Sequence, residues 1–475
     1  MQLIRKAPYI FLLGLGMVIA IAFAYLIAKL QLVFIILCVA LISGFFLLLY
    51  LYNDPFKGFY LALIFSFLVN GLTRYITNIP LGLGVDVLLV LSLILAVISK
   101  KKPHLDLLNN GAIWLSLVWL GFTILELFNP EAPSKEAWFY AVRAVSLYQI
   151  FTVFIVLMYL RNKSEIYFVT HLIFGLSVFA ALWGYKQVFI GIDNYEWQWL
   201  LEGPIKTHIL RGVLRAFSFL SDSGQFGATM GYAGIVAIIL ALGPFSIKKR
   251  VLFILIFLIC IYAMAISGTR GALFVPASAS MAYLVATKNF KSIIAGVVIL
   301  GSVFFFLKYT AIGNDNQTLR RMRSALNPED PSLKVRLENQ ERFKVYLKTR
   351  PFGGGIGTSG TWGLRFSPKT FLAQTPNDSW YVKIWAETGV VGLYTHVLMI
   401  LFFVFKGYAV IFSLHDPILK QYVMALHSGF IGIAFAALGN PILGQFPLNI
   451  MLYFTWGALY VAEYLNKKDH EIQSK

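Results

Sequence analysis

The chain alternates long apolar runs with short polar segments over almost its whole length. A membrane-spanning helix needs about 20 apolar residues, and about fourteen runs approach that length. The expected spans are residues 8–28, 31–51, 57–72, 81–99, 111–128, 144–160, 166–190, 223–243, 251–267, 271–287, 292–311, 379–406, 421–439 and 445–464. This pattern predicts an all-α polytopic membrane protein with about 12–14 transmembrane helices.

Two longer polar connections interrupt the apolar runs, at about residues 191–222 and about residues 312–378. In the second, residues 332–349 repeat apolar side chains at roughly helical spacing, which predicts a short amphipathic helix at the membrane surface. We therefore expect four parts along the chain. They are N-terminal transmembrane helices (1–190), helices with outer arginine motifs (191–311), an outer loop (312–378), and C-terminal helices with a cytoplasmic tail (379–475).

Composition and charge agree with a membrane protein. Of the 475 residues 58% are hydrophobic and 13% are charged, whereas a soluble domain has about a quarter charged. The net charge of +18 does not indicate a nucleic-acid partner, because the basic residues are dispersed in short loops, where they set topology. Most basic clusters fall on one side if both termini are cytoplasmic, which leaves 312–378 on the outer face. Both cysteines lie in apolar runs, so no cysteine-based metal site is expected.

Three short blocks fall on the predicted outer face, and each carries arginine. They are 211–227 (RGVLRAFSFLSDSGQFG), 267–271 (SGTRG) and 350–393, which starts RPFGGGIG and ends TPNDSWYVKIWAETGVVGL. Arginine beside glycine-rich turns suits a phosphate or diphosphate at the membrane surface. The candidate ligands of the diphosphate are Arg215, Arg270, Arg211 and Arg350. The alternatives are that Arg270 anchors a span in the headgroups, and that the basic loop meets anionic membrane lipids.

Acidic and amide side chains accompany these arginines. Asp222 follows Arg215 by seven residues, at the mouth of a span, where it can cap the helix and can also act as the catalytic base. This position places Asp222 ahead of Glu387 as the expected base. Residues 377–387 are expected to form a helix above the membrane, which places Glu387 near the interface. A match to G-x-G-x-x-G at 355–360 follows a proline turn rather than a strand, so it does not indicate a dinucleotide site.

In their order and spacing, these blocks resemble the O-antigen ligase and O-antigen polymerase superfamily of bacterial envelope glycan assembly, over roughly residues 205–410. The resemblance implies a glycan donor on a polyprenyl diphosphate, a glycan or lipid acceptor, and transfer with inversion at the outer face of the bacterial inner membrane. It also implies that neither a metal nor another cofactor takes part. The catalytic residues expected on this basis are Asp222, Glu387 and Asn377.

One position departs from the family pattern. Ligases of the family commonly have histidine before the asparagine of the last motif, and this chain has Pro376. The base is therefore left open among Asp222, Asp378, Glu387 and His208, and the missing histidine favours a polymerase slightly over a ligase. A flippase or transporter of lipid-linked oligosaccharide is the alternative function. It is disfavoured because the expected spans are almost free of ionisable residues.

Overall fold

The computed structural model describes residues 17, 38–39, 41–77, 79–210, 212–315, 317–327 and 329–473. Arg211 and, apart from Met17, the expected span 8–28 lie outside the described residues. Most of the expected span 31–51 lies outside them too, but its described end continues as a helix, Leu41–Asn53.

Helices form nearly the whole described structure, and eight helical runs are long and apolar enough to cross a membrane. These are α2 (Phe56–Tyr75), α4 with its last turn (Gly111–Phe128), the run of α5 (Lys135–Val142) and α6 (Tyr148–Tyr159), α7 (Lys163–Tyr185) with a π turn to Ile190, α10 (Ser223–Ala241), α11 (Ile247–Ile266), α18 (Trp380–Ser413) and α19 (Pro417–Ala436). Shorter or more polar helices complete the bundle: α3 (Leu83–Leu95), α12 (Phe274–Thr287), α13 (Phe290–Tyr309) and α20 (Leu448–Gln473). The fold is the all-α polytopic membrane protein that the hydropathy predicts.

The expected spans agree with these helices in position. Residues 57–72, the shortest expected span, are part of a 20-residue helix, α2. The expected span 144–160 starts earlier than predicted, because α5 runs into α6 through a π turn without leaving the bundle. The total of 12–14 spans and the four-part division of the chain stay predictions.

Helix α10 is the centre of the bundle half that carries the arginine motifs. It is buried on nearly all sides and packs against α11, α12 and α19. Small residues permit this approach. A Cβ at Gly227 would lie 2.4 Å from Oγ of Ser267, and one at Gly231 would lie 3.1 Å from Sδ of Met264. The close packing brings the SGTRG turn against the first turn of α10.

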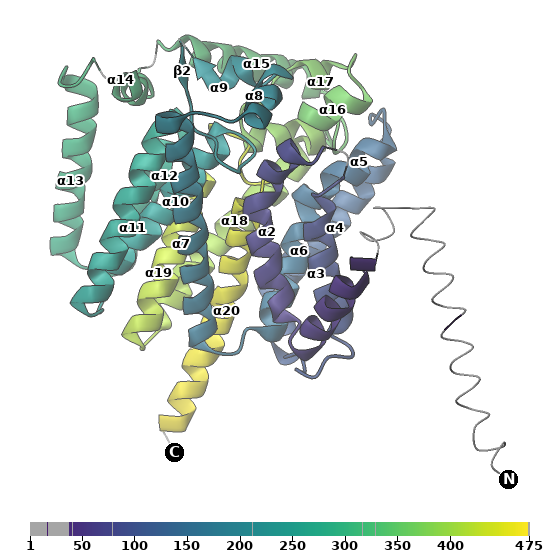
Figure 1. The fold of residues 1–475 in the computed structure, drawn as a ribbon, viewed down its shortest axis with the longest axis vertical. Coiled ribbons are helices and arrows are strands. Elements are labelled where there is room, and N and C mark those ends of the chain that lie inside the picture. Colours follow the sequence, from purple (N-terminus) through teal and green to yellow (C-terminus); the bar gives the residue numbers. More distant parts are fainter. Residues whose placement is uncertain are drawn as a thin grey trace.

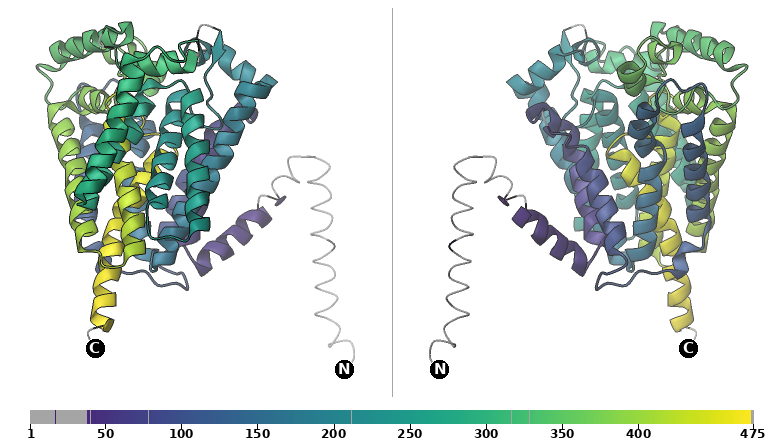
Figure 2. Two further views of the ribbon diagram at one scale, coloured as in Figure 1. Left: turned by 90° about the vertical axis from the view of Figure 1, so that its left-hand side faces the viewer. Right: turned by 90° about the vertical axis from the view of Figure 1, so that its right-hand side faces the viewer.

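Short elements cover one end of the bundle, which we call the loop-covered end (Figures 1 and 2). They are α8 (Asn194–Leu201), α9 (Ile205–His208), the hairpin of β1 (Ile209–Leu210) and β2 (Val213–Leu214), α14 (Gln317–Ser324), α15 (Pro331–Leu347), α16 (Gly360–Phe366) and α17 (Phe371–Gln374). Helix α15 confirms the helix expected within 332–349. The C-terminus lies at the opposite end.

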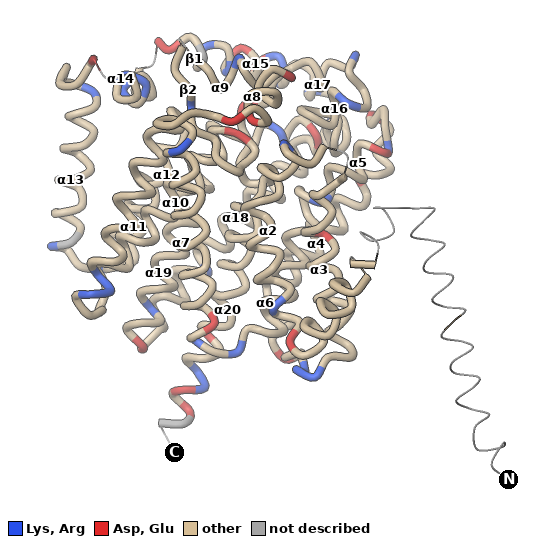
Figure 3. The backbone as a smooth tube through the Cα atoms, in the orientation of Figure 1, with Lys and Arg blue, Asp and Glu red and all other residues tan. Residues whose placement is uncertain are grey.

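Charged residues gather at the two ends of the helices, with few along their length (Figure 3). This distribution is typical of a bundle whose middle lies in hydrocarbon. The loop 312–378 and the C-terminal tail lie at opposite ends, as the expected topology requires. Which end faces the cytoplasm stays a prediction.

Candidate functional site

Arg215 joins the first arginine block to the second. It lies in the turn between β2 and α10, and its guanidinium donates three hydrogen bonds. Nε donates to the carbonyl of Ser267 (3.0 Å), Nη1 to the carbonyl of Thr207 (2.7 Å) and Nη2 to Oγ1 of Thr269 (2.8 Å). A planar guanidinium held at three points keeps its remaining N–H groups in a fixed direction.

Other arginines lie close to Arg215. Burial, together with the charges of Arg321 and Arg270, lowers the pKa of Arg215 to about 10, and the charge of Asp222 acts in the opposite direction. We call Arg215, Arg270 and Arg321 the arginine cluster. Three positive charges in a partly buried place repel one another, and an anion bound among them would remove that repulsion.

Gly268 lies between two members of the cluster. Its φ is +58°, and a Cβ here would lie 3.4 Å from Cγ of Arg215 and 3.3 Å from Nε of Arg321. Arg321 also donates from Nε to the carbonyl of Gly268 (2.8 Å). Helix α14 of the long loop thus brings Arg321 to the SGTRG turn. Sequence reasoning missed this residue, because Arg320 and Arg323 in the same short helix look equivalent to it.

Arg270 begins a short 3-10 turn, Arg270–Leu273, which leads into α12. It forms an ion pair with Asp330 from the long loop, and its Nη1 lies 3.4 Å from Oγ of Ser324. A carboxylate therefore already fits beside the cluster. The N-terminal ends of α10 and of this turn also meet here, and helix N-termini add positive potential for an anion.

Asp222 is the N-cap of α10. Its Oδ1 accepts hydrogen bonds from the backbone N–H groups of Gly224 (2.6 Å) and Gln225 (2.9 Å), and its Oδ2 accepts one from the hydroxyl of Ser221 (3.0 Å). The structure thus gives Asp222 the capping role that the sequence left open. Both carboxylate oxygens are engaged, so a substrate hydroxyl would have to compete with these hydrogen bonds.

Glu387 and Asn377 belong to one hydrogen-bond chain. Asn377 donates from Nδ2 to the hydroxyl oxygen of Ser359 (2.8 Å), and that hydroxyl donates to Oε1 of Glu387 (2.6 Å). Glu387 is completely buried, and its Oε2 has no hydrogen-bond partner among the described residues. The chain therefore connects an asparagine at the edge of the site to a carboxylate inside the fold.

The glycine-rich turn 353–357 packs against a kink in α18. At the kink, Gly389 has φ +64° and ψ −166°, a conformation open almost only to glycine. The N–H of Gly355 donates to the carbonyl of Glu387 (2.8 Å), and a Cβ at Gly389 would lie 2.0 Å from the carbonyl oxygen of Pro351. The turn is buried, and its hydrogen bond supports the backbone of α18 at Glu387.

Arg350 has contacts different from those of the cluster. Its Nε donates to Glu131 (2.8 Å), its Nη1 donates to the carbonyl of Tyr346 (2.9 Å), and its guanidinium lies over the Tyr346 ring. None of these partners is shared with Arg215 or Arg270. The fourth candidate, Arg211, lies outside the described residues.

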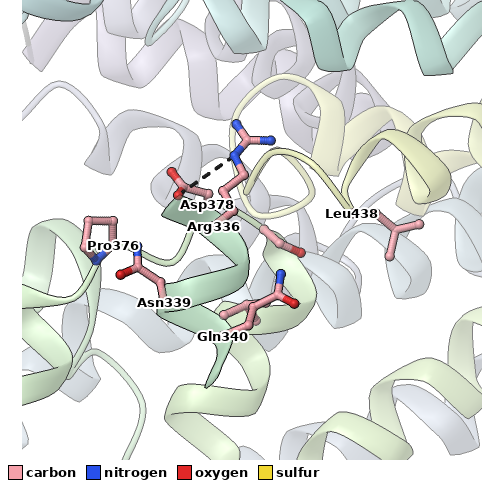
Figure 4. A pocket seen from close by; sticks show the side chains of 8 residues that line it. Arg336, Asn339, Gln340, Pro376, Asp378 and Leu438 are labelled. Carbon is pink, nitrogen blue, oxygen red and sulfur yellow. Dashed lines mark ion pairs between the residues drawn. The ribbon is translucent and has the colours of Figure 1, made fainter. Parts of the chain in front are cut away.

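A small polar pocket opens beside the start of α18 (Figure 4). Asp378 and Arg336 of α15 face each other there, with 3.9 Å between Oδ2 and Nε. The cavity volume is about 10 Å³, enough for a single water. Asn339 also lines it, and the Nδ2 of this buried side chain has no hydrogen-bond partner among the described residues. The side chain of Asp378 is 41% exposed and does not cap a helix. Asp378 is therefore the most accessible of the four base candidates.

The loop 437–447, which joins α19 to α20, connects this pocket to the arginine cluster. A Cβ at Gly439 would lie 3.6 Å from Nη1 of Arg336, and one at Gly271 would lie 2.2 Å from Nδ2 of Asn440. Asn440 therefore lies against Gly271, the residue after Arg270, although the two are far apart in sequence. The apolar pattern around the loop offered no signal for this role.

His208 is nearly fully buried between Trp199 and Phe217. Burial lowers its pKa, and its Nδ1 lies 2.9 Å from the carbonyl oxygen of Pro204. A side chain enclosed in this way is better suited to support the turn before Arg215 than to meet a substrate. The backbone N–H of Arg215 indeed donates to the carbonyl of His208 (2.8 Å).

Arg74, at the end of α2, is a buried residue that the sequence did not single out. Its guanidinium donates to the carbonyls of Ser218 and Leu220 and lies over the rings of Trp199 and Phe217. It therefore holds the turn that carries Arg215 and Asp222. A lone arginine at the end of a span looks like a membrane anchor in sequence, so nothing pointed to this role.

The fold and these residues define a polytopic membrane protein with a cluster of three arginines at the loop-covered end. Residues 255–397 match the family model described as O-antigen ligase. Over 324 residues, which are 65% of this chain and 77% of the relative, the chain is 25% identical to an O-antigen polymerase of Salmonella muenchen. Both matches confirm the resemblance to the O-antigen ligase and polymerase superfamily, and they support a multi-pass membrane enzyme of O-antigen assembly.

The family match includes Arg270, Asn377 and Glu387, whereas Arg215 and Asp222 precede it. The roles of all five residues stay predictions. Within the described ranges, no three His, Cys, Asp or Glu side chains gather in a way that could hold a metal ion. Metal independence is likewise still a prediction.

Proposed function

We propose that this protein is a membrane glycosyltransferase that extends or transfers a glycan carried on a polyprenyl diphosphate, at the outer face of the bacterial inner membrane. One observation carries the proposal. Arg215, Arg270 and Arg321 come from three separate segments and meet at two helix N-termini. A diphosphate carries enough charge and enough acceptor oxygens to engage three guanidinium groups at once.

The arginine cluster would act on the leaving group. As the acceptor oxygen attacks C1 of the donor sugar, the bond from C1 to the diphosphate oxygen breaks and negative charge builds up on that oxygen. Guanidinium groups already in place stabilise this charge without reorganisation, which is the role that a divalent cation fills in other transferases. The attack comes from the face opposite the diphosphate, so the configuration at C1 is inverted.

The acceptor hydroxyl must lose its proton during the attack. Asp378 is the best-placed base, because its carboxylate is exposed in the pocket and meets only Arg336 at 3.9 Å. Asp222 has both oxygens engaged in capping, and Glu387 is completely buried. We therefore place Asp378 ahead of Asp222. Asn377, through Ser359, and Glu387 would hold the start of α18 in position.

Polymerisation is favoured over ligation because Pro376 occupies the position where family ligases commonly have histidine. The name of the Salmonella relative also supports a polymerase. The glycan profile of a deletion strain tests this choice. Loss of long chains with single repeats retained supports a polymerase, whereas long chains left on the lipid carrier indicate a ligase, and an unchanged profile rejects both.

Turnover of a purified lipid-linked donor in EDTA tests whether metal is needed. We expect full activity, because the proposed charge stabilisation comes from arginine alone. Activity that appears only when Mg²⁺ is added back would show that a cation shares the role of the cluster.

A further inference from the structure

A second cavity lies at the end of the bundle opposite the loop-covered end. It is an open cavity, lined by the end of α12 with its turn to α13, by Phe412 of α18 and by the start of α19. Its volume is about 460 Å³, which falls within the range of small-molecule sites. The arginine cluster and its partners take no part in it.

Two lysines line this cavity, Lys288 and Lys420. Neither has an ion-pair partner among the described residues, although carboxylates occur at the same end. Two of those carboxylates are paired with other lysines: Asp416 with Lys163, and Glu463 with Lys406. The cavity thus holds two positive charges with no negative charge assigned to them.

Lys288 has an unusual backbone conformation, with φ +50° and ψ 18°. Residues other than glycine rarely adopt this left-handed region. Here it ends α12, and Nζ of Lys288 lies 3.6 Å from the centroid of the Phe412 ring of α18. The ammonium group is thereby held at the mouth of the cavity, where a lysine on a regular helix end would be free to move away.

The two helices that carry Lys288 and Phe412 also expose apolar side chains. Met281 and Val285 of α12 and Phe405 and Phe412 of α18 are exposed. The two helices are joined at this level, because the hydroxyl of Tyr408 donates to the carbonyl of Ala282 (3.1 Å). A ligand with an anionic head and long apolar chains matches this combination of lysines below and exposed apolar side chains above.

We propose that this cavity binds the phosphate headgroup of an anionic membrane phospholipid, with the acyl chains along α12 and α18. Lys288 and Lys420 contact the phosphate. The amide of Gln421, one residue after Lys420, lines the same cavity and is fixed by a hydrogen bond from its Nε2 to the carbonyl of Ile239. Basic pockets between transmembrane helices bind such headgroups through this chemistry. The proposal stands on its own observations and does not depend on the proposed function.

Native mass spectrometry of the full-length protein, with added phosphatidylglycerol or phosphatidylcholine, tests this site. The double variant Lys288→Ala/Lys420→Ala should bind phosphatidylglycerol about 25-fold more weakly than the unmodified protein, about fivefold for each lysine. Binding of phosphatidylcholine should not change. The matched control is Lys248→Ala/Lys249→Ala, which removes two exposed lysines at the same end that do not line the cavity.

Two results would overturn the proposal. The first is an equal loss in the control, which would mean that net charge alone attracts the lipid. The second is binding of inorganic phosphate by the cavity with no preference for phosphatidylglycerol, which would identify a soluble anion as the ligand. Lys288→Arg/Lys420→Arg keeps both charges and should retain the lipid. Comparison with this variant shows whether the alanine variant loses the lipid through lost charge or through misfolding.

Discussion

An arginine near a membrane surface either anchors a helix in the headgroups or binds an anion, and its hydrogen bonds distinguish the two roles. The guanidinium of Arg215 donates to two carbonyls and a hydroxyl of other segments. The charges of two further arginines lower its pKa. A snorkelling arginine needs no such support. At Arg350, in contrast, the hydrogen bond to Glu131 raises the pKa of the guanidinium. The same residue type thus has different surroundings at two positions that look alike in sequence.

Alanine at Arg215 or Arg270 should lower the transfer rate by at least about 10²-fold, because each removes a donor to the developing charge. Lysine should also be poor at Arg215, since a single ammonium group cannot replace a fork of donors. In vitro turnover of the lipid-linked donor measures both effects. Arg350→Ala is the matched control and should retain most activity. An equal loss in all three alanine variants would mean that these arginines act only through the general charge of the surface.

Two carboxylates can be compared directly as bases. Asp378→Asn should slow transfer by about 10²–10⁴-fold if Asp378 takes the proton. Asp222→Asn should be much milder, because asparagine is as good an N-cap as aspartate. Rates at saturating donor, with thermal unfolding as a check of folding, distinguish them. A slow Asp222→Asn variant together with an Asp378→Asn variant of normal rate would identify Asp222 as the base.

At the scale of elements, the kink in α18 decides where the last motif lies. The motif and the span that follows it form one helical run, Trp380–Ser413, which changes direction at Gly389. The glycine-rich turn fits into the bend and donates to the carbonyl of Glu387. The buried carboxylate, the bend and the turn therefore act as one support for Asn377.

Gly389→Ala should destabilise the protein by about 1–3 kcal/mol, because alanine cannot easily adopt the backbone conformation at the kink. The new methyl group would also meet the carbonyl oxygen of Pro351 at 2.0 Å. The apparent Tm in detergent should fall, and transfer activity should fall with it.

Gly175→Ala in α7 provides the control, because no atom lies within 4 Å of a Cβ there. That variant should be neutral or slightly more stable, since alanine favours a helix over glycine. A Gly389→Ala variant with unchanged Tm and activity would show that the bend is not needed for the site.

At the scale of the whole molecule, four segments that are distant in sequence meet at one end of the bundle. They are the turn before α10, the SGTRG turn, α14 with α15, and the loop 437–447. Their shared location requires that the spans between them cross the membrane in the expected order. The proposed function therefore requires that the loop-covered end faces outward.

Single cysteines at Lys369 and His470, both exposed, test this topology in a background without Cys38 and Cys260. An impermeant thiol reagent added to spheroplasts should label Lys369→Cys. It should label His470→Cys only after the cells are opened, because the basic clusters keep that end inside. Labelling of His470→Cys in intact cells would contradict the outer location of the site.

The sequence by itself determined the membrane class and the approximate limits of the helices, and its motifs predicted the nature of the site. Hydropathy acts over about 20 residues, and each motif lies within a short stretch, so both can be read locally. The tertiary structure decided which charges meet. It brought Arg321 to Arg215, paired Arg350 with Glu131, engaged Asp222 as a cap and buried Glu387 behind Ser359. These outcomes depend on contacts between segments far apart in the chain, and no local pattern records which partner a charged side chain will find.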